Sequence, residues 1–323
     1  MVHNEKEDDA MINGLLSVML PVFGCIIIGY ALVRRGIIET KGADAINRFV
    51  YFASFPALLF TFVARTPIEK VWNQAFLCTW LLSLSLTYVV TLVVSRLIIG
   101  DGAAEMAVRA MNCTCANTAF MGIPLLILAL GKEAALPGIL ATMVIVTIFF
   151  NLTIVMIEVG RHKGTVTTLD LLAKVAFSLA KNPLMLAVFA GALSSALFTM
   201  PKAIMAFGEL LGNAAVPCSL IAVGAFIASQ RISDTVSGSL IPTAIKLLLH
   251  PLLTWVIVTW VIAMDPIWSA ASILLAALPS AASCFVIARQ HGILVAETSG
   301  TIWLSTVLSA GTVVVVLSLM HLV

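Results

Sequence analysis

The sequence predicts an all-α polytopic membrane protein with ten transmembrane helices, arranged as two inverted repeats of five helices. Three observations support this prediction: the composition, the spacing of the apolar stretches, and the matched prolines and glycines in the two halves. Hydrophobic residues make up 61% of the 323 residues, charged residues only 11%, and the mean hydropathy is +1.09. Soluble domains carry roughly 25% charged residues because they need a polar surface. A chain this apolar is expected to face lipid.

Charge and cysteine usage argue against several classes of protein. The formal net charge is +2, and no Lys/Arg tract interleaved with aromatic residues suggests nucleic-acid binding. All six cysteines lie in apolar stretches, so we expect neither a disulfide framework nor a metal site, and no cofactor. The N-terminus is acidic and lacks the basic region of a secretory signal, so the first apolar stretch is expected to remain in the protein.

The apolar stretches have the length of membrane spans. A helix needs about 20 apolar residues to cross the hydrocarbon core. Applied along the chain, this length predicts spans near 12–33, 43–64, 72–99, 104–130, 135–157, 182–199, 203–228, 239–263, 267–289 and 297–320. The second and seventh are the least regular because polar residues enter them, and residues 169–181 are expected to form an amphipathic surface helix.

The distribution of Lys and Arg predicts the orientation. Cytoplasmic loops carry an excess of these residues. With the N-terminus outside, the cytoplasmic connections hold twelve of them and the outside connections five. We therefore expect both termini outside, in a bacterial inner membrane.

Matched residues predict a duplication into residues 1–165 and 166–323, which an odd number of spans per repeat would place in opposite orientations. Three sets of residues recur at offsets of 162, 161 and 165: Pro21 and Gly29 as Pro183 and Gly191, Pro56 as Pro217, and Phe120 as Phe285. The alternative is coincidence, since Pro and Gly are frequent in membrane helices.

Two spans contain polar and helix-breaking residues near their middle. In the fourth span, Asn117 is followed by Gly122 and Pro124; the ninth contains Pro279 followed by Ser280 and Ser283. Proline removes a backbone donor, and an interrupted helix is tolerated at membrane depth only where protein or a water-filled cavity satisfies the freed groups. Paired interruptions in two halves indicate a transporter binding site, where half-helix N-termini attract an anion. The alternative is a pair of proline-kinked packing helices.

The segment Asn-Thr-Ala-Phe-Met-Gly-Ile-Pro-Leu-Leu (117–126) closely resembles the fourth-helix motif of the auxin efflux carrier family, whose bacterial members include malonate carriers. Weaker matches follow in the family's order over nearly the whole chain: Leu20-Pro-Val-Phe, Phe55-Pro-Ala-Leu-Leu-Phe, Asn182-Pro183, Lys246-Leu-Leu-Leu-His-Pro251 and Ser305-Thr-Val-Leu-Ser309.

The resemblance implies that the broken fourth and ninth helices cross and that substrate binds beside the crossing. A scaffold of helices 1, 2, 6 and 7 would hold a transport domain that moves like an elevator, and members often form homodimers through the scaffold. Asn117 matches the asparagine at the crossing in the first repeat. The second repeat commonly has an asparagine where this chain has Ser283, so the family's substrate identity is not carried over.

Ionisable residues in the spans supply further candidates. Lys246 and His250 lie one helical turn apart in the eighth span and share a face. Lys246 would be a counter-charge for a carboxylate and His250 a proton-sensitive partner; the alternative is that Lys246 extends to an interface or pairs with a structural acid. Glu209 is expected to lie in a short polar loop before the seventh span.

The expected function is secondary transport of a small organic anion, such as malonate, malate or an auxin-like acid, coupled to the membrane potential, H⁺ or Na⁺. Asn117 and Ser283 would hydrogen-bond the substrate, with Thr114 and Ser280 as neighbours. A sodium-coupled carrier of the bile-acid type remains an alternative. An enzyme is not expected because no nucleophile or metal set is present at membrane depth. A channel would show a continuous polar stripe along its spans, and a receptor would carry a signalling domain. These two classes remain as further alternatives.

Overall fold

The computed structural model describes all residues except 1, 67–71, 162–179, 198–199, 231–235 and 321–323, and within the described residues the named secondary-structure elements are all helical. Most of the expected amphipathic helix at 169–181 lies outside these residues. In the first half the helices and shorter turns are α1 (Val2–Arg34), α2 (Thr40–Phe49), η1 (Val50–Ser54), α3 (Phe55–Arg65), α5 (Gln74–Val94), η2 (Ser95–Ile99), α6 (Ala103–Thr114), η3 (Thr118–Gly122), α7 (Ile123–Leu130), η4 (Lys132–Ala134), α8 (Ala135–Val144), η5 (Ile145–Phe149) and α9 (Phe150–Arg161).

The second half continues with α11 (Pro183–Leu197), α12 (Lys202–Asn213), α13 (Ala215–Ser229), α14 (Val236–Ala244), η6 (Ile245–Leu249), α15 (His250–Val256), η7 (Ile257–Val261), α16 (Pro266–Ala276), α17 (Ala282–His291) and α18 (Val295–Met320). Asn182 begins α11, because its side-chain oxygen accepts the backbone N–H of Leu184 at 2.9 Å.

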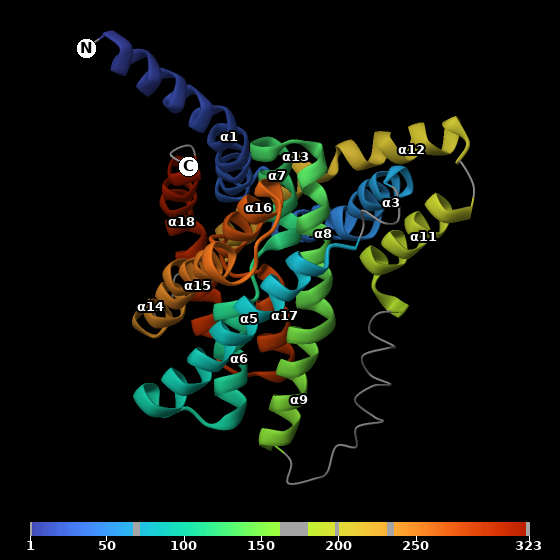
Figure 1. Cartoon of the computed structure of the whole chain (residues 1–323). Helices are drawn as coiled ribbons and strands as arrows, with labels where there is room; N and C mark the ends of the chain where they lie inside the picture. Colours follow the sequence, from blue (N-terminus) through green and yellow to red (C-terminus); the bar gives the residue numbers. More distant parts are fainter. Residues whose placement is uncertain (1, 67–71, 162–179, 198–199, 231–235, 321–323) are drawn as a thin grey trace.

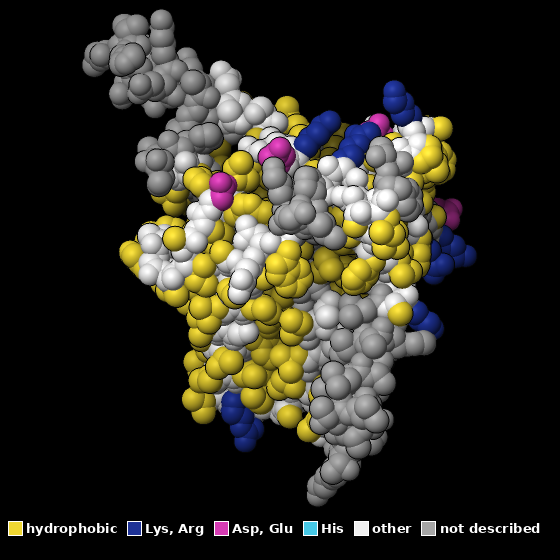
Figure 2. Space-filling view, turned by 45° about the vertical axis from the view of Figure 1, so that its right-hand side comes forward, with side chains coloured by type: hydrophobic (Ala, Val, Ile, Leu, Met, Phe, Trp, Pro, Cys, Tyr) yellow, Lys and Arg dark blue, Asp and Glu magenta, His cyan; other side chains and the backbone are white. Residues whose placement is uncertain are grey.

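Seven helices among the described residues are long and apolar enough to cross a membrane: Asn13–Arg34, Lys41–Arg65, Gln74–Ile99, Lys132–Gly160, Lys202–Ser229, Ser237–Val261 and Val295–Met320. Three shorter apolar helices, Thr118–Leu130, Pro183–Leu197 and Pro266–Ala276, lie where the fourth, sixth and ninth spans were expected. Hydrophobic side chains outnumber charged ones on the face in Figure 2, and the charged side chains visible there lie mainly toward its top, right and bottom.

The irregular spans have wide π-helical turns next to proline. η1, η3 and η6 each end one residue before an X-Pro pair: Phe55-Pro56, Ile123-Pro124 and His250-Pro251. Proline clashes with the carbonyl group four residues earlier, and a wider turn removes that clash without ending the helix. The seventh span is divided instead at Ala214, between the end of α12 and the start of α13.

Close helix crossings occur at glycines in both halves. A Cβ atom on Gly29 of α1 would lie 2.1 Å from the carbonyl oxygen of Ile221, and one on Gly224 of α13 would lie 1.9 Å from that of Ile26. Similarly, a Cβ atom on Gly191 of α11 would lie 3.0 Å from the carbonyl oxygen of Phe60 in α3. Each crossing therefore joins a helix of one half to a helix of the other.

One expected loop is a helix. Glu209 lies within α12, and its carboxylate forms an ion pair with Arg65 at the end of α3, with both side chains about half exposed. The expectation of a short polar loop at Glu209 is wrong because the polar residues of this segment lie on one side of a helix whose glycines pack on α3. A Cβ on Gly212 would lie 3.0 Å from the Cα of Leu58.

Candidate functional site

Two segments in the middle of the fold leave the helical conformation. The first lies between α6, which ends at Thr114, and η3, which begins at Thr118; the second lies between α16, which ends at Ala276, and α17, which begins at Ala282. We call residues 115–117 and 277–281 together the crossover. Asn117, Pro279 and Ser280 belong to it, and Thr114 and Ser283 adjoin it.

The two segments of the crossover pair with each other. Ala116 and Ser280 form an isolated antiparallel bridge. The N–H of Asn117 donates to the carbonyl oxygen of Pro279, and the N–H of Ala281 donates to that of Cys115, both at 2.9 Å. Buried backbone groups without partners are costly at membrane depth. Each segment therefore satisfies groups that its own interrupted helix leaves open.

A backbone carbonyl of α6 and a side chain of α18 bind the crossover. The hydroxyl of Ser280, which is fully buried, donates to the carbonyl oxygen of Asn112 at 2.5 Å, and its N–H donates to the hydroxyl of Ser305 at 3.2 Å. The amide nitrogen of Asn112 donates to Thr298 at 2.8 Å. The hydroxyl of Thr114 donates within its own helix, to the carbonyl of Ala110.

Asn117 is the polar residue of the crossover whose side chain remains available. It is 5% exposed, and its amide makes no hydrogen bond to any residue that the structure describes. The backbone carbonyl oxygen of Asn117 accepts the N–H of Gly122 at 2.9 Å, and this bond belongs to the first turn of η3. Two helical segments, η3 with α7 and α17, thus begin beside the crossover, and helix N-termini carry partial positive charge. Ser283, in the first turn of α17, is exposed.

The helix-breaking residues allow close packing at this point. A Cβ on Gly122 would lie 2.8 Å from a methyl group of Leu275 and 2.9 Å from one of Leu278. Pro124 is buried in the first turn of α7. Pro279, which has no N–H, contributes only its carbonyl, and that group accepts from Asn117.

Lys246 and His250 lie inside the protein, next to the second segment of the crossover. Both are fully buried. The Lys246 ammonium donates to the carbonyl oxygen of Ala276 at 2.7 Å and lies 3.0 Å from Nδ1 of His250. Ala276 is the last residue of α16, so Lys246 is joined to the end of the half-helix that leads into the crossover.

Two aromatic contacts flank the crossover. Phe120 of η3 packs edge-on against Phe55 at the start of α3, with ring centroids 5.3 Å apart, and Phe285 of α17 packs edge-on against Phe226 of α13 at 5.8 Å. Phe120 and Phe285 are the matched pair from the two halves. Each broken span therefore meets a helix of the proposed scaffold through one phenylalanine.

Sequence reasoning missed Asn112, Thr298 and Ser305 as supports of the crossover. Asn112 opens the polar run of the fourth span, and Ser305 belongs to a segment that matches the family, but neither position indicates a partner. Their contacts join residues separated by 186 and 25 positions in the chain.

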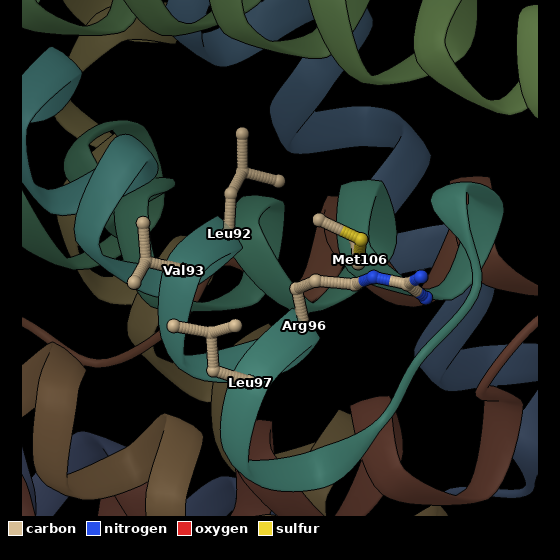
Figure 3. A pocket seen from close by; sticks show the side chains of 5 residues that line it. All are labelled: Leu92, Val93, Arg96, Leu97 and Met106. Atoms are coloured by element: carbon tan, nitrogen blue, oxygen red, sulfur yellow. The ribbon is translucent and has the colours of Figure 1, made fainter.

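A shallow pocket lies between the end of α5, the turn η2 and the start of α6 (Figure 3). It is lined by Leu92, Val93, Arg96, Leu97 and Met106, and none of these belongs to the crossover. Its lining is apolar apart from Arg96, as expected for a lipid-facing surface near a membrane interface.

The connection between α5 and α6 carries a buried ion pair. Nε of Arg109 lies 2.6 Å from Oδ2 of Asp101, and the hydroxyl of Ser95 donates to the same oxygen at 2.5 Å. Burial raises the pKa of the Asp101 carboxyl, but the hydrogen bonds from Arg109 and Ser95 outweigh burial and hold this pKa below its usual value. The ion pair fixes the start of the fourth span, because Arg109 also reaches the carbonyl of Gly238 in α14.

The chain is similar over nearly its whole length to proteins described as transporters. Residues 15–317 match the family described as "Membrane transport protein". The chain belongs to this family, the auxin efflux carriers. One similar protein is the "Putative malonate transporter" of Rhizobium meliloti (strain 1021), which is 32% identical over 94% of each chain. Another is an "Uncharacterized transporter" of Methanothermobacter thermautotrophicus, 23% identical over 92% of this chain and 95% of its own.

Membership of this family confirms the resemblance expected from residues 117–126 and establishes an integral membrane transporter. The family and its relatives are transporters, which agrees with the expectation that the chain is not an enzyme.

Proposed function

We propose that the protein is a secondary transporter of a small organic anion, with its substrate site at the crossover. The observation that carries the proposal is the pairing of two non-helical segments from the two halves of the chain, Ala116 with Ser280. Beside this pairing lie the helix N-termini and the uncommitted Asn117 amide. These groups suit a carboxylate, since backbone N–H groups and an amide donor stabilise negative charge without a net protein charge.

The proposal includes ten spans in two inverted repeats, residues 1–165 and 166–323. The reciprocal glycine crossings support it: Gly29 of the first span meets the seventh, and Gly191 of the sixth meets the second. The described start of α1 and end of α18 also lie toward the same end of the molecule, whereas α9 ends at the opposite end (Figure 1). An even number of crossings requires this arrangement of the termini.

Transport would proceed by an elevator-like movement of the broken spans against a scaffold of spans 1, 2, 6 and 7. The small aromatic contacts Phe55–Phe120 and Phe226–Phe285 support it, because rings can slide past one another without breaking hydrogen bonds. Both termini would lie outside a bacterial inner membrane. A homodimer would form through the scaffold, whose helix α11 exposes Phe189 and Leu193.

The substrate is a dicarboxylate or similar small carboxylate, and malonate is the first to test because of the name of the relative at 32% identity. The experiment is uptake of labelled malonate, malate and indole-3-acetate into proteoliposomes, with and without an imposed potential. We expect saturable uptake that Asn117→Ala abolishes. Asn151→Ala is the matched control, because among the described residues the Asn151 amide bonds only to carbonyls within its own span.

The proposal predicts full uptake by the Asn151 variant. Undiminished uptake by folded Asn117→Ala protein would remove the crossover site. Absence of uptake of every carboxylate by the wild type would show that the substrate class is wrong.

A further inference from the structure

Lys246 is unusual among the lysines of the described chain. It is fully buried, whereas Lys41, Lys132, Lys181 and Lys202 are exposed. No carboxylate of a described residue lies within 4.0 Å of its ammonium. An unpaired charge inside a membrane protein is expensive and by default marks a functional site. What balances this ammonium is therefore informative.

The partner of Lys246 is the end of a helix. Its ammonium donates to the carbonyl oxygen of Ala276, the last residue of α16. The C-terminal end of a helix carries partial negative charge, and cations are stabilised there. In transporters with broken helices, such carbonyl ends hold the coupling Na⁺ or H⁺. Here a side chain of the protein provides the cation at that position.

Among the described residues of the first repeat, no cation takes the corresponding position. The corresponding end of α6 is satisfied by neutral groups, because Ser280 donates to the carbonyl of Asn112 and the Cys284 thiol points to that of Met111. The asymmetry places one charge beside the crossover, in the second half only.

His250 lies next to this ammonium and allows the charge of the pair to change. Its Nδ1 lies 3.0 Å from the Lys246 ammonium and must accept, so in this state the imidazole is neutral with its proton on Nε2. Nε2 is buried and has no partner among the described residues. The pair thus holds one exchangeable proton: the protonated form carries one positive charge, and releasing H⁺ to water leaves neutral Lys246 and neutral His250.

Among the described residues, the other groups next to the pair carry no fixed charge. The titratable side chains that act on Lys246 are the thiols of Cys113 in α6, Cys115 in the crossover and Cys284 in α17. On α5, the Trp80 ring lies 5.6 Å from the His250 ring. The charged residues Arg109 of α6 and Glu297 of α18 lie at Gly238, about two helical turns away along the eighth span.

We propose that Lys246 and His250 form the proton-binding site of this carrier, with the Lys246 ammonium taking the place of a coupling metal cation at the end of α16. The inference rests on the proposed function and specifies its coupling ion. Loss of the proton weakens the bond to the Ala276 carbonyl, and this changes the end of the half-helix that leads into Pro279 and the pairing with Asn117. Anion transport then needs no sodium and follows the proton gradient.

The first test reads the pair without transport. A proton gained or lost beside the Trp80 indole changes its fluorescence, so purified protein is titrated between about pH 5 and about pH 10. We expect a pH-dependent component that disappears in Trp80→Phe, Lys246→Met and His250→Gln and persists in Lys202→Met, which changes an exposed lysine. Lys246→Arg keeps the charge but cannot release a proton, so it should fold and lack the titration. A flat Trp80 signal in folded wild type would overturn the proposal.

The second test measures malonate uptake into proteoliposomes with sodium replaced by choline. Wild-type uptake should be unchanged without sodium. With one proton per substrate, a gradient of about one pH unit supports up to ~10-fold accumulation, and Lys246→Arg should lose this response. Uptake that requires sodium would refute the inference and leave the carrier function standing. A Trp80 titration without carboxylate uptake would leave the proton site standing and refute the proposed substrate class.

Discussion

Ser280 and Ser283 are three residues apart and have opposite surroundings. Ser280 is fully buried and donates to the carbonyl of Asn112, while Ser283 is exposed in the first turn of α17. We expect Ser280→Ala to destabilise the protein by about 1–3 kcal/mol, because a buried acceptor loses its donor. Ser283→Ala should leave stability unchanged and raise the KM for the anion. Thermal unfolding in detergent and uptake kinetics measure the two effects; equal loss of stability in both variants would contradict the assignment.

Asp101 makes stability depend on pH at the start of the fourth span. Its pKa is lower in the folded protein than in the unfolded chain, so its contribution is present above the unfolded value and is lost as pH falls through the folded one. We expect Asp101→Asn to be less stable than the wild type near neutral pH. The difference should close below about pH 4. Unfolding midpoints against pH check this; a constant difference would exclude the ion pair as its cause.

At the scale of elements, the helix crossings require glycine, which has a hydrogen atom where other residues have a Cβ atom. A Cβ on Gly224 would lie 1.9 Å from the Ile26 carbonyl, whereas a Cβ on Gly311 of α18 meets nothing within 4 Å. Backbone cannot yield as a flexible side chain does, so Gly224→Ala must separate α1 from α13. We expect it to destabilise by about 2–5 kcal/mol, and Gly311→Ala to be neutral or slightly stabilising. Unfolding curves of the two variants provide the comparison.

The elements were more predictable than their contacts. The apolar stretches indicated the helices because a span must satisfy its own backbone groups, and the Asn117-to-Pro124 motif marked one break. The partner of that break lies more than 160 residues away and is a backbone group, which has no side-chain signature. The same holds for the bond from Lys246 to Ala276. Glu209 was misassigned because helical packing through Gly208 and Gly212 outweighed its polarity.

At the scale of the whole molecule, the orientation is open to a direct test. The even number of proposed spans would put the two termini on the same side, and the Lys/Arg excess would make that side the outside. We expect alkaline phosphatase fused after residue 323 to be active in a bacterial host, and a fusion at the Arg161–Asp170 connection to be inactive, because the enzyme needs the periplasm. The reverse pattern would invert the orientation and leave the repeats unchanged.

The pairing of residues 115–117 with 279–281 also matters while the chain is being made. At about 5–20 residues per second, the ribosome reaches the second segment on the order of 10–30 seconds after the first. Throughout that interval the open backbone groups near Asn117 sit in a nascent chain without their partners. A premature stop before Pro279 would strand them permanently, so truncated products should be recognised and degraded rather than accumulate as a half-carrier.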